Sequence, residues 1–283
     1  MPELPEVETI KKGFQKKLIN KTIEKVLVKT TTLIKMSRIN ELLSKLPNAR
    51  ISDVKRRGKY IIINLNIDYK LIIHLGMSGR LEYFPATDKE TSTKIFKSHE
   101  KHDHIFFFFD DNSKLVYNDV RKFGKIWFLK NKEKLPRIET LGFEPLEKEF
   151  TFDEFLKLLK NCTKNIKKLL MDQKKITGIG NIYANEILFH SRIHPLRKAN
   201  LLSKDEAKLL YLNIKKILLE AIELKGTTMM DESYIDLEGN KGRYGEVVKV
   251  YGKKNGICPA CGQPLEIIRI ENRSTFVCPN CQR

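Results

Sequence analysis

Apolar positions recur every three to four residues near the start of the chain and every second residue further on. Val7, Ile10, Phe14 and Leu18 line one face of a helix. From residue 22 to residue 130, short runs of β-branched and aromatic residues alternate with turns. We expect strands at 23–29, 60–66, 70–75, 79–84, 104–109, 113–118 and 125–129, and a polar loop at 86–101. Short strands separated by turns predict a β-sandwich or a barrel.

The helical period returns in the second half of the chain. Lys and Glu cluster around two prolines between residues 131 and 150, which indicates a hinge. Thr151 with Glu154, and Ser203 with Glu206, form possible capping boxes. We expect helices from 151, over 164–171 and 181–190, and from 203 to 224, then a long irregular stretch over 226–245 and short strands after residue 246. A loop of that length inside a compact protein is typically functional or mobile.

Composition narrows the class of protein. The chain has 283 residues, of which 41% are hydrophobic, enough for two domains with buried cores. No apolar run approaches the ~18 residues that span a membrane. The acidic, proline-containing start is not a secretory signal. We therefore expect a cytoplasmic protein with no membrane partner.

The net charge of +18 favours a polyanionic partner, because each Lys or Arg that neutralises a phosphate releases condensed counterions. The alternative is codon drift, since the chain is rich in Lys, Ile and Asn. An anionic membrane fits less well, because no basic amphipathic anchor is present. Charge alone thus ranks nucleic acid first.

The first residues carry candidate chemistry. Once Met1 is removed, Pro2 presents a secondary amine, followed by Glu3 and Glu6. An α-amino group has a reference pKa of about 7.7–8.0, so part of it is a neutral nucleophile at pH 7. Such an amine forms Schiff bases with electrophilic carbon. The alternative is plain helix-start chemistry, because Pro and Glu are both favoured in a first helical turn.

The cysteines fall into a metal-site pattern. Two Cys-x-x-Cys pairs are separated by 16 residues, and the remaining Cys162 stands alone. Four thiolates fill the tetrahedral shell of one structural Zn2+ ion and leave no position for a catalytic water. A redox dithiol is the alternative, but it calls for a βαβ context that is absent here. The predicted ligands are Cys258, Cys261, Cys278 and Cys281.

Several turns carry residues suited to DNA. The Gly178–Asn181 segment precedes a helix, where backbone N–H groups can converge on a phosphate, although Asn181 is equally a helix cap. Arg56, Arg57 and Lys59 are either phosphate contacts or a solvated edge. Met77 lies between two glycines in a strand connection. Arg121 and Phe123 project to one side of another connection, as a side-chain wedge for an opened duplex requires.

Together these segments resemble the formamidopyrimidine-DNA glycosylase family, bacterial enzymes that excise oxidised purines. The resemblance covers essentially the whole chain in order. Its motifs are residues 2–8, 56–60, 74–79, 101–104, 121–124 and 178–183, and the terminal cysteine quartet with Arg273.

The resemblance implies an α+β multidomain fold that binds damaged double-stranded DNA as a monomer, with no small-molecule cofactor. It divides the chain into an N-terminal β-sandwich catalytic domain (1–131), a hinge (132–150), a helix–two-turn–helix domain (151–225), a lesion-recognition loop (226–250) and a zinc-ribbon hairpin (251–283).

The resemblance also implies residue roles. Pro2 would attack C1′ and expel the base, with Glu3 as the acid/base partner and Glu6 as a supporting carboxylate. Lys59 would act in β-elimination and Arg273 in δ-elimination, although both are also plausible phosphate ligands. The residues implied to fill the gap left by the flipped nucleotide are Met77, Arg121 and Phe123, and those implied to contact DNA are His74, His102, Asn181 and Tyr251.

The chain departs from the family pattern in places. Val120 replaces a common proline, and Lys122 replaces a frequent Arg. Thr227 and Thr228 match the loop that closes over the lesion, but residues 229–234 do not predict a base preference. Two other interpretations stay open: an endonuclease VIII-type glycosylase for oxidised pyrimidines, and a zinc-ribbon DNA-binding protein without catalytic activity. The Pro2 amine with Glu3 separates the second of these from an enzyme.

Overall fold

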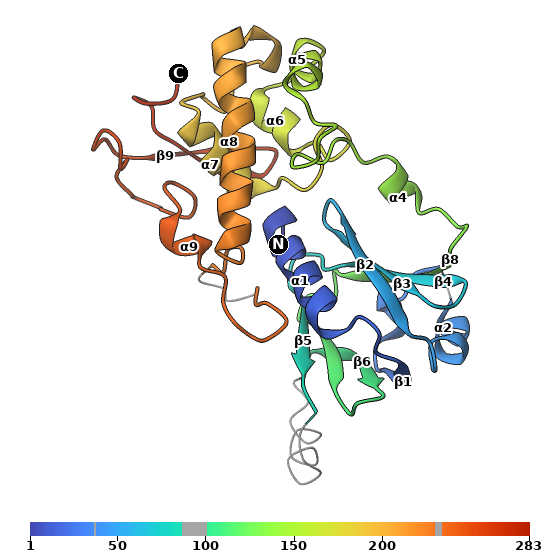
Figure 1. Ribbon diagram of the computed structural model, residues 1–283. Helices are drawn as coiled ribbons and strands as arrows, with labels where there is room; N and C mark the ends of the chain where they lie inside the picture. The colour runs from blue at the N-terminus through green and yellow to red at the C-terminus, as the bar shows by residue number, and fades with distance from the viewer. Residues whose placement is uncertain (37, 87–100, 230–233) are drawn as a thin grey trace. The chain divides into compact units, whose positions relative to one another are not determined.

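The computed structural model describes residues 1–36, 38–86, 101–229 and 234–283. The chain forms two compact units, one made of Met1–Glu139 with Lys225–Arg243 and one of Thr140–Leu224 with Tyr244–Arg283. Figure 1 shows the first unit as a β-sandwich and the second as a group of helices with a β-hairpin. The polar loop expected at 86–101 lies almost entirely outside the described residues.

Helix α1 (Leu4–Lys17) opens the first unit and follows the predicted apolar face. Val7, Ile10 and Phe14 are at most 1% exposed and pack in the sandwich core. Pro5 stands in the first turn, and Lys16 and Lys17 in the last, where they complement the helix dipole. The helix-start interpretation is therefore confirmed, and it does not conflict with a reactive Pro2.

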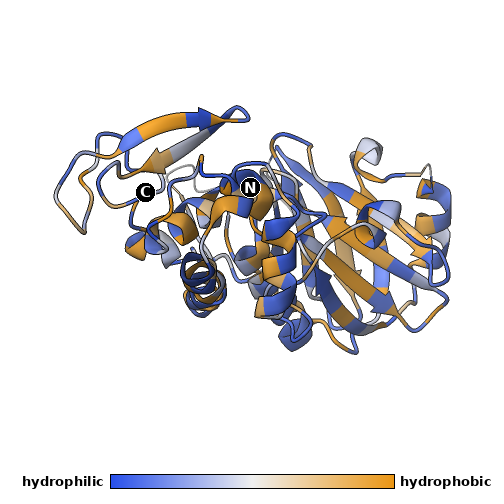
Figure 2. Cartoon of the chain, turned by 90° about the horizontal axis from the view of Figure 1, so that it is seen from above, coloured by the Kyte–Doolittle hydropathy of each residue, from blue (hydrophilic) through white to orange (hydrophobic). Residues whose placement is uncertain are grey.

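Two antiparallel four-stranded sheets build the sandwich. The first sheet has the order β1 (Ile23–Val28), β6 (Asp103–Phe109), β7 (Lys114–Asp119) and β5 (Gly79–Phe84). The second has the order β2 (Ile51–Arg57), β3 (Tyr60–Leu65), β4 (Tyr69–His74) and β8 (Lys125–Lys130). Both sheets contribute to one hydrophobic core. Long hydrophobic stretches colour the strands of the sandwich in Figure 2. The predicted sandwich is confirmed.

Strand β2 was not expected from the sequence. Its buried residues Ile51 and Val54 are three positions apart, because the register with β3 shifts between Ile51 and Asp53. A bulge of this kind hides the two-residue period by which strands are recognised. Three short elements of the first unit were not expected either, namely η1 (Thr31–Leu33), α2 (Ile39–Lys45) and α4 (Pro136–Glu139).

Helices dominate the second unit, as predicted. Thr151 caps α5 (Phe152–Lys160), and Ser203 forms a complete capping box with Glu206 at the start of α8 (Lys204–Glu223). The remaining elements are α6 (Ile166–Met171), α7 (Asn181–His190), η2 (Ala199–Leu201) and α9 (Tyr244–Val247). Helix α7 is buried almost throughout, so it forms the centre of this unit.

The chain ends in a two-stranded hairpin, β9 (Glu266–Ile270) with β10 (Arg273–Val277). Glu271 and Asn272, both with positive φ, make the turn, and Arg273 begins β10 opposite Ile270. None of the helices in the described ranges has the length and apolar character needed to cross a bilayer.

Candidate functional site

The N-terminal segment is held by a buried carboxylate. Glu6 is 1% exposed and accepts the backbone N–H of Glu3 at 2.7 Å. Its other oxygen accepts the N–H of Thr227 at 2.8 Å, across 221 residues of sequence. Two hydrogen bonds to one buried carboxylate fix its position strongly. Glu6 therefore joins the start of the chain to the start of the 225–243 segment.

Gly226 makes this junction possible. Its φ of +82° is a left-handed conformation that favours glycine, and an added Cβ would lie 2.8 Å from Glu6 Oε1. Glu3 occupies the N-cap position of α1, directly after Pro2. The structure thus places the predicted nucleophile and two carboxylates within one helical turn, beside the start of the 225–243 segment.

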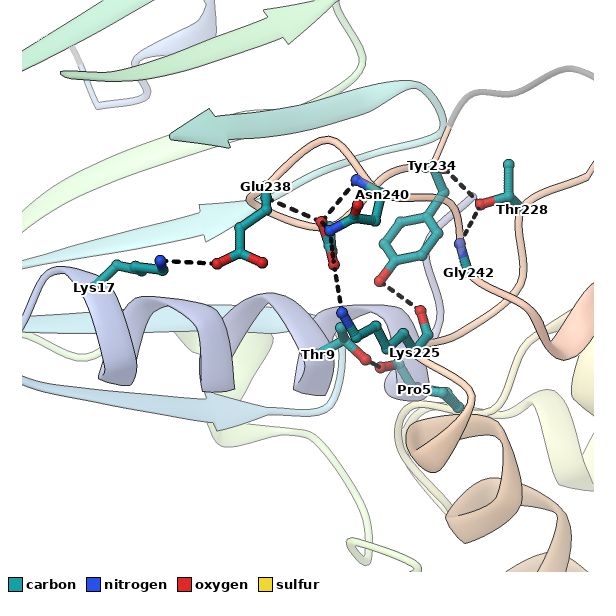
Figure 3. A network of polar contacts seen from close by, with 10 residues as sticks. Pro5, Thr9, Lys17, Lys225, Thr228, Tyr234, Glu238, Asn240 and Gly242 are labelled. Atoms are coloured by element: carbon teal, nitrogen blue, oxygen red, sulfur yellow. Dashed lines mark hydrogen bonds and ion pairs between the residues drawn. The ribbon is translucent and has the colours of Figure 1, made fainter. Parts of the chain in front are cut away.

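Hydrogen bonds within the 225–243 segment hold its shape, and an ion pair joins it to α1 (Figure 3). The Tyr234 hydroxyl donates to the Lys225 carbonyl at 2.9 Å, and the Thr228 hydroxyl donates to the Tyr234 carbonyl at 2.7 Å. Lys17 of α1 forms an ion pair with Glu238 at 2.8 Å. Burial raises the pKa of Tyr234 well above its ordinary value, so its hydroxyl stays a donor. Residues 230–233, where a base preference was sought, lie outside the described part.

Lys59 and His74 are neighbours beside the second sheet. Lys59 is 7% exposed and lies in the β2–β3 turn, and His74 pairs in register with Tyr60. Burial, together with the positive charges of Lys59, Lys125 and Arg137, lowers the pKa of His74 to about 4. The imidazole is therefore neutral at pH 7, and its Nδ1 accepts the N–H of Gly76 at 3.2 Å.

Three predicted wedge residues lie on two strand connections of the first unit. Met77 on the β4–β5 turn is 41% exposed, and Phe123 on the β7–β8 loop is 51% exposed. The guanidinium of Arg121 lies 4.6 Å from the centre of the Phe123 ring, a cation–π arrangement. Val120, also on this loop, is 57% exposed. Exposed apolar side chains on rigid turns are suited to insertion between bases.

His102 joins the same region through its main chain. Its carbonyl accepts the N–H of Asp119 at 3.0 Å, so the described end of the segment before β6 is attached to the last residue of β7. The side chain of His102 is partly exposed.

The second unit holds the other predicted DNA contacts. Asn181 is not the helix cap, since Gly180 is the N-cap of α7 and the Asn181 amide donates to the Ser274 carbonyl at 3.1 Å. The capping interpretation is thus wrong, and the amide instead attaches α7 to the hairpin. In the phosphate interpretation the Gly178 N–H would be a ligand, but it donates to Gln173 at 2.8 Å. Arg273 is exposed at the start of β10.

Sequence reasoning missed a second buried carboxylate. Glu186 on α7 is 0% exposed and accepts the N–H groups of Lys249, Val250 and Tyr251 at 2.8, 2.9 and 2.8 Å. It thereby positions Tyr251, whose ring packs against Phe276 of the hairpin. Glu186 is the one acidic residue of a largely apolar helix, and that was the available signal.

Lys167 was also not singled out. Its side chain is 1% exposed, and its amine donates to the Thr275 hydroxyl at 2.7 Å. A buried lysine must be hydrogen-bonded to remain charged. It attaches α6 to the hairpin that carries Arg273.

The four paired cysteines form one cluster. Their sulfur atoms all lie within 4.8 Å of one another, with Cys258 to Cys281 at 3.8 Å and Cys261 to Cys278 at 3.5 Å. Zinc–sulfur bonds of about 2.3 Å in a tetrahedron place sulfurs about 3.8 Å apart. The residues therefore fit a structural Zn2+ ion that closes the base of the hairpin, and a redox dithiol is not needed to explain them.

Comparison with known families agrees with this geometry. Residues 1–126 match the formamidopyrimidine-DNA glycosylase N-terminal domain, and residues 141–233 match the formamidopyrimidine-DNA glycosylase H2TH domain. The chain is 42% identical to the formamidopyrimidine-DNA glycosylase of Carboxydothermus hydrogenoformans and 41% identical to that of Wolbachia pipientis, covering 100% of both chains in each case.

Solved structures of the same family are similar to this chain over its whole length. The MutM (Fpg) protein of Thermus thermophilus is 33% identical, with a TM-score of 0.86 over 99% of this chain and 98% of that one. A mutant of Lactococcus lactis Fpg, solved in complex with Fapy-dG-containing DNA, is 33% identical, with a TM-score of 0.89 over 100% of both chains. The resemblance read from the motifs is confirmed: the chain belongs to the formamidopyrimidine-DNA glycosylase family.

Proposed function

We propose that this protein is a bifunctional DNA glycosylase and abasic-site lyase that removes 8-oxoguanine and formamidopyrimidines from double-stranded DNA. The observation that carries the proposal is the N-terminal arrangement, in which Pro2 directly precedes Glu3 and Glu6 holds both that segment and Thr227. Relatives of the same fold have been solved with carbocyclic 8-oxo-G and with abasic-site DNA. The net charge of +18 supports a DNA partner.

The proposed reaction begins once Met1 has been removed. The lone pair of the Pro2 nitrogen attacks C1′ of the damaged nucleotide, and the bond from C1′ to the base breaks, so the base leaves with the bonding electrons and takes up a proton. Glu3 protonates the ring oxygen as the sugar opens, and an iminium ion forms between Pro2 and C1′. The iminium acidifies the proton on C2′, which prepares the strand for cleavage.

Strand cleavage follows by two eliminations. Loss of the C2′ proton expels the 3′ phosphate, and a second elimination expels the 5′ phosphate; water then releases the sugar fragment from Pro2. We assign Lys59 to the first step and Arg273 to the second, each also as a phosphate ligand. We assign His74, His102, Asn181 and Tyr251 to hydrogen bonds with the DNA backbone. The zinc ion bound by the four cysteines supplies folding energy to the hairpin and no chemistry.

Borohydride trapping tests the proposal directly. Borohydride reduces the iminium to a stable amine, so protein lacking Met1 should become covalently attached to an 8-oxoguanine duplex. Pro2→Gly should give much less adduct, and a chain that retains Met1 should give none. The matched control is Pro5→Ala, which changes a proline in the same turn without altering the amine. No adduct with the processed, zinc-loaded protein would favour DNA binding without catalysis.

A second candidate substrate class is the oxidised pyrimidines. A Lactococcus lactis Fpg relative has been solved with oxidised-pyrimidine DNA, so the family site accommodates such bases. We assign the purines as the preferred substrates, because the motifs at residues 2–8 and 74–79 are those of the purine enzymes. Comparing excision of the two lesion types at one salt concentration decides between them. We place this activity in the bacterial cytoplasm.

A further inference from the structure

Two surface turns of the first unit meet at one buried carboxylate. Asp119, the last residue of β7, is 0% exposed. On one side lies the β4–β5 turn with Met77, and on the other the β7–β8 loop with Arg121 and Phe123. The proposed reaction does not use Asp119.

Each carboxylate oxygen of Asp119 accepts hydrogen bonds from these turns. Oδ1 accepts the Ser78 hydroxyl at 2.6 Å and the Arg121 N–H at 3.2 Å. Oδ2 accepts the Gly124 N–H at 2.7 Å. The Ser78 oxygen in turn accepts the Arg121 N–H at 3.1 Å. A single hydroxyl therefore bridges the turn that carries Met77 and the loop that carries Arg121.

The backbones of the two turns are also in contact. Gly76 has a φ of +67°, and a Cβ there would lie 2.6 Å from the Gly124 nitrogen. A Cβ on Gly124 would overlap the Tyr117 hydroxyl. His104 of strand β6 adds a further contact, because its Nε2 lies 2.9 Å from the carbonyl of Asp119, where the β7–β8 loop begins. Neither turn can move without the other, because close-packed groups transmit displacement.

We propose that Asp119 and the Ser78 hydroxyl are positioning residues that join the two turns into one rigid wedge. Met77, Arg121 and Phe123 then enter the opened duplex as a unit. The inference rests on the proposed function. It specifies the part of the DNA that the wedge contacts, namely the base stack beside the flipped nucleotide. Fixing three side chains beforehand matters, because a misplacement of about 1 Å can cost about 100-fold in rate.

Ser78→Ala tests this inference, because it removes the bridge without leaving a buried charge. Single-turnover excision of 8-oxoguanine from a duplex at saturating protein should slow about tenfold. The unstacking phase reported by 2-aminopurine beside the lesion should slow equally. Cleavage of an abasic site in single-stranded DNA has no base stack to open and should change less than about twofold. Ser78→Thr, which keeps the hydroxyl, should restore the rate.

The matched control is Ser44→Ala, since the Ser44 hydroxyl donates to the Glu41 carbonyl within α2 and belongs to neither turn. Arg121→Ala provides a double-mutant cycle: in that background Ser78→Ala should slow excision less than about threefold further, because the wedge is already incomplete. Asp119→Asn should show the same pattern with a larger effect, because an amide cannot accept all of these donors.

Two results would overturn the inference alone, provided that the unsubstituted protein excises 8-oxoguanine. One is an unchanged excision rate in Ser78→Ala, and the other is fully multiplicative effects of Ser78→Ala and Arg121→Ala. Failure of the unsubstituted, processed protein to excise 8-oxoguanine would instead overturn the proposed function, and this inference with it.

Discussion

Glu6 in the first unit and Glu186 in the second are both buried carboxylates that accept backbone N–H groups, yet they do different things. Glu6 binds one N–H beside Pro2 and one from Thr227, two segments far apart in the chain. Glu186 binds three successive N–H groups of one segment, residues 249–251. Glu6 therefore joins the N-terminal segment to the start of the 225–243 segment, whereas Glu186 holds residues 249–251 against α7. We expect Glu6 to govern chemistry and Glu186 to govern binding.

Removing a thiolate would disrupt the second region most completely. Cys258→Ser should abolish stoichiometric zinc and with it the hairpin, because structural zinc contributes about 10 kcal/mol or more of apparent folding energy. DNA affinity should fall by at least about 100-fold, since Arg273, which we propose as a phosphate ligand, loses its support. Metal analysis and fluorescence anisotropy check both. A variant without zinc that still binds DNA normally would show that the hairpin is not part of the DNA interface.

Glu6→Gln sharpens the comparison from the first unit. The amide keeps the shape but can accept only through one oxygen, so either the Glu3 or the Thr227 contact is lost. We expect single-turnover excision to slow about 100-fold, roughly 3 kcal/mol of transition-state stabilisation, with DNA affinity within about threefold. Anisotropy and quenched-flow assays on one duplex separate the two quantities. An equal loss of affinity would contradict a purely catalytic role.

Glu186→Gln is the matching change in the second unit. It should lower the free energy of unfolding by about 2 kcal/mol, because at least one buried N–H loses its charged acceptor. DNA affinity should fall about tenfold through Tyr251, with the rate at saturation unchanged. Urea unfolding and DNA titration measure these effects. If the saturated rate fell as steeply as in Glu6→Gln, the division of roles between the two carboxylates would be wrong.

The smallest expected effect concerns pH. Burial and positive neighbours lower the pKa of His74 to about 4, below its unfolded value of about 6.5. The unfolded chain therefore binds more protons between these values, so stability falls as pH decreases through that window. We expect a loss on the order of 2 kcal/mol between pH 7 and pH 5, absent in His74→Gln. Urea unfolding midpoints at the two pH values test this prediction. The same change of stability with pH in the unsubstituted protein and in His74→Gln would contradict it.

The parts that sequence predicted are those that depend on neighbours along the chain. The apolar face of Val7, Ile10 and Phe14 and the spacing of the cysteine pairs both follow from local periodicity and composition. Strand β2 was missed because its bulge sets Ile51 and Val54 three residues apart. The short motifs identified the family, and the resemblance in turn implied roles for Pro2 and the two carboxylates that follow it.

The remaining features depend on long-range contacts. Glu186, Asp119 and Asn181 owe their roles to partners that only folding supplies: the 249–251 segment, the two wedge turns and the Ser274 carbonyl. A lone acidic residue or an Asn before a helix has many local explanations. Only the folded structure distinguishes a helix cap from a tertiary hydrogen bond.

Peptide mapping of the borohydride-trapped adduct tests the central claim most directly. The protein, trapped on an 8-oxoguanine duplex and then digested, should carry the reduced sugar on the nitrogen of Pro2, in a peptide that lacks Met1. An adduct on Lys59 or on another lysine, or full activity from protein that retains Met1, would contradict the account.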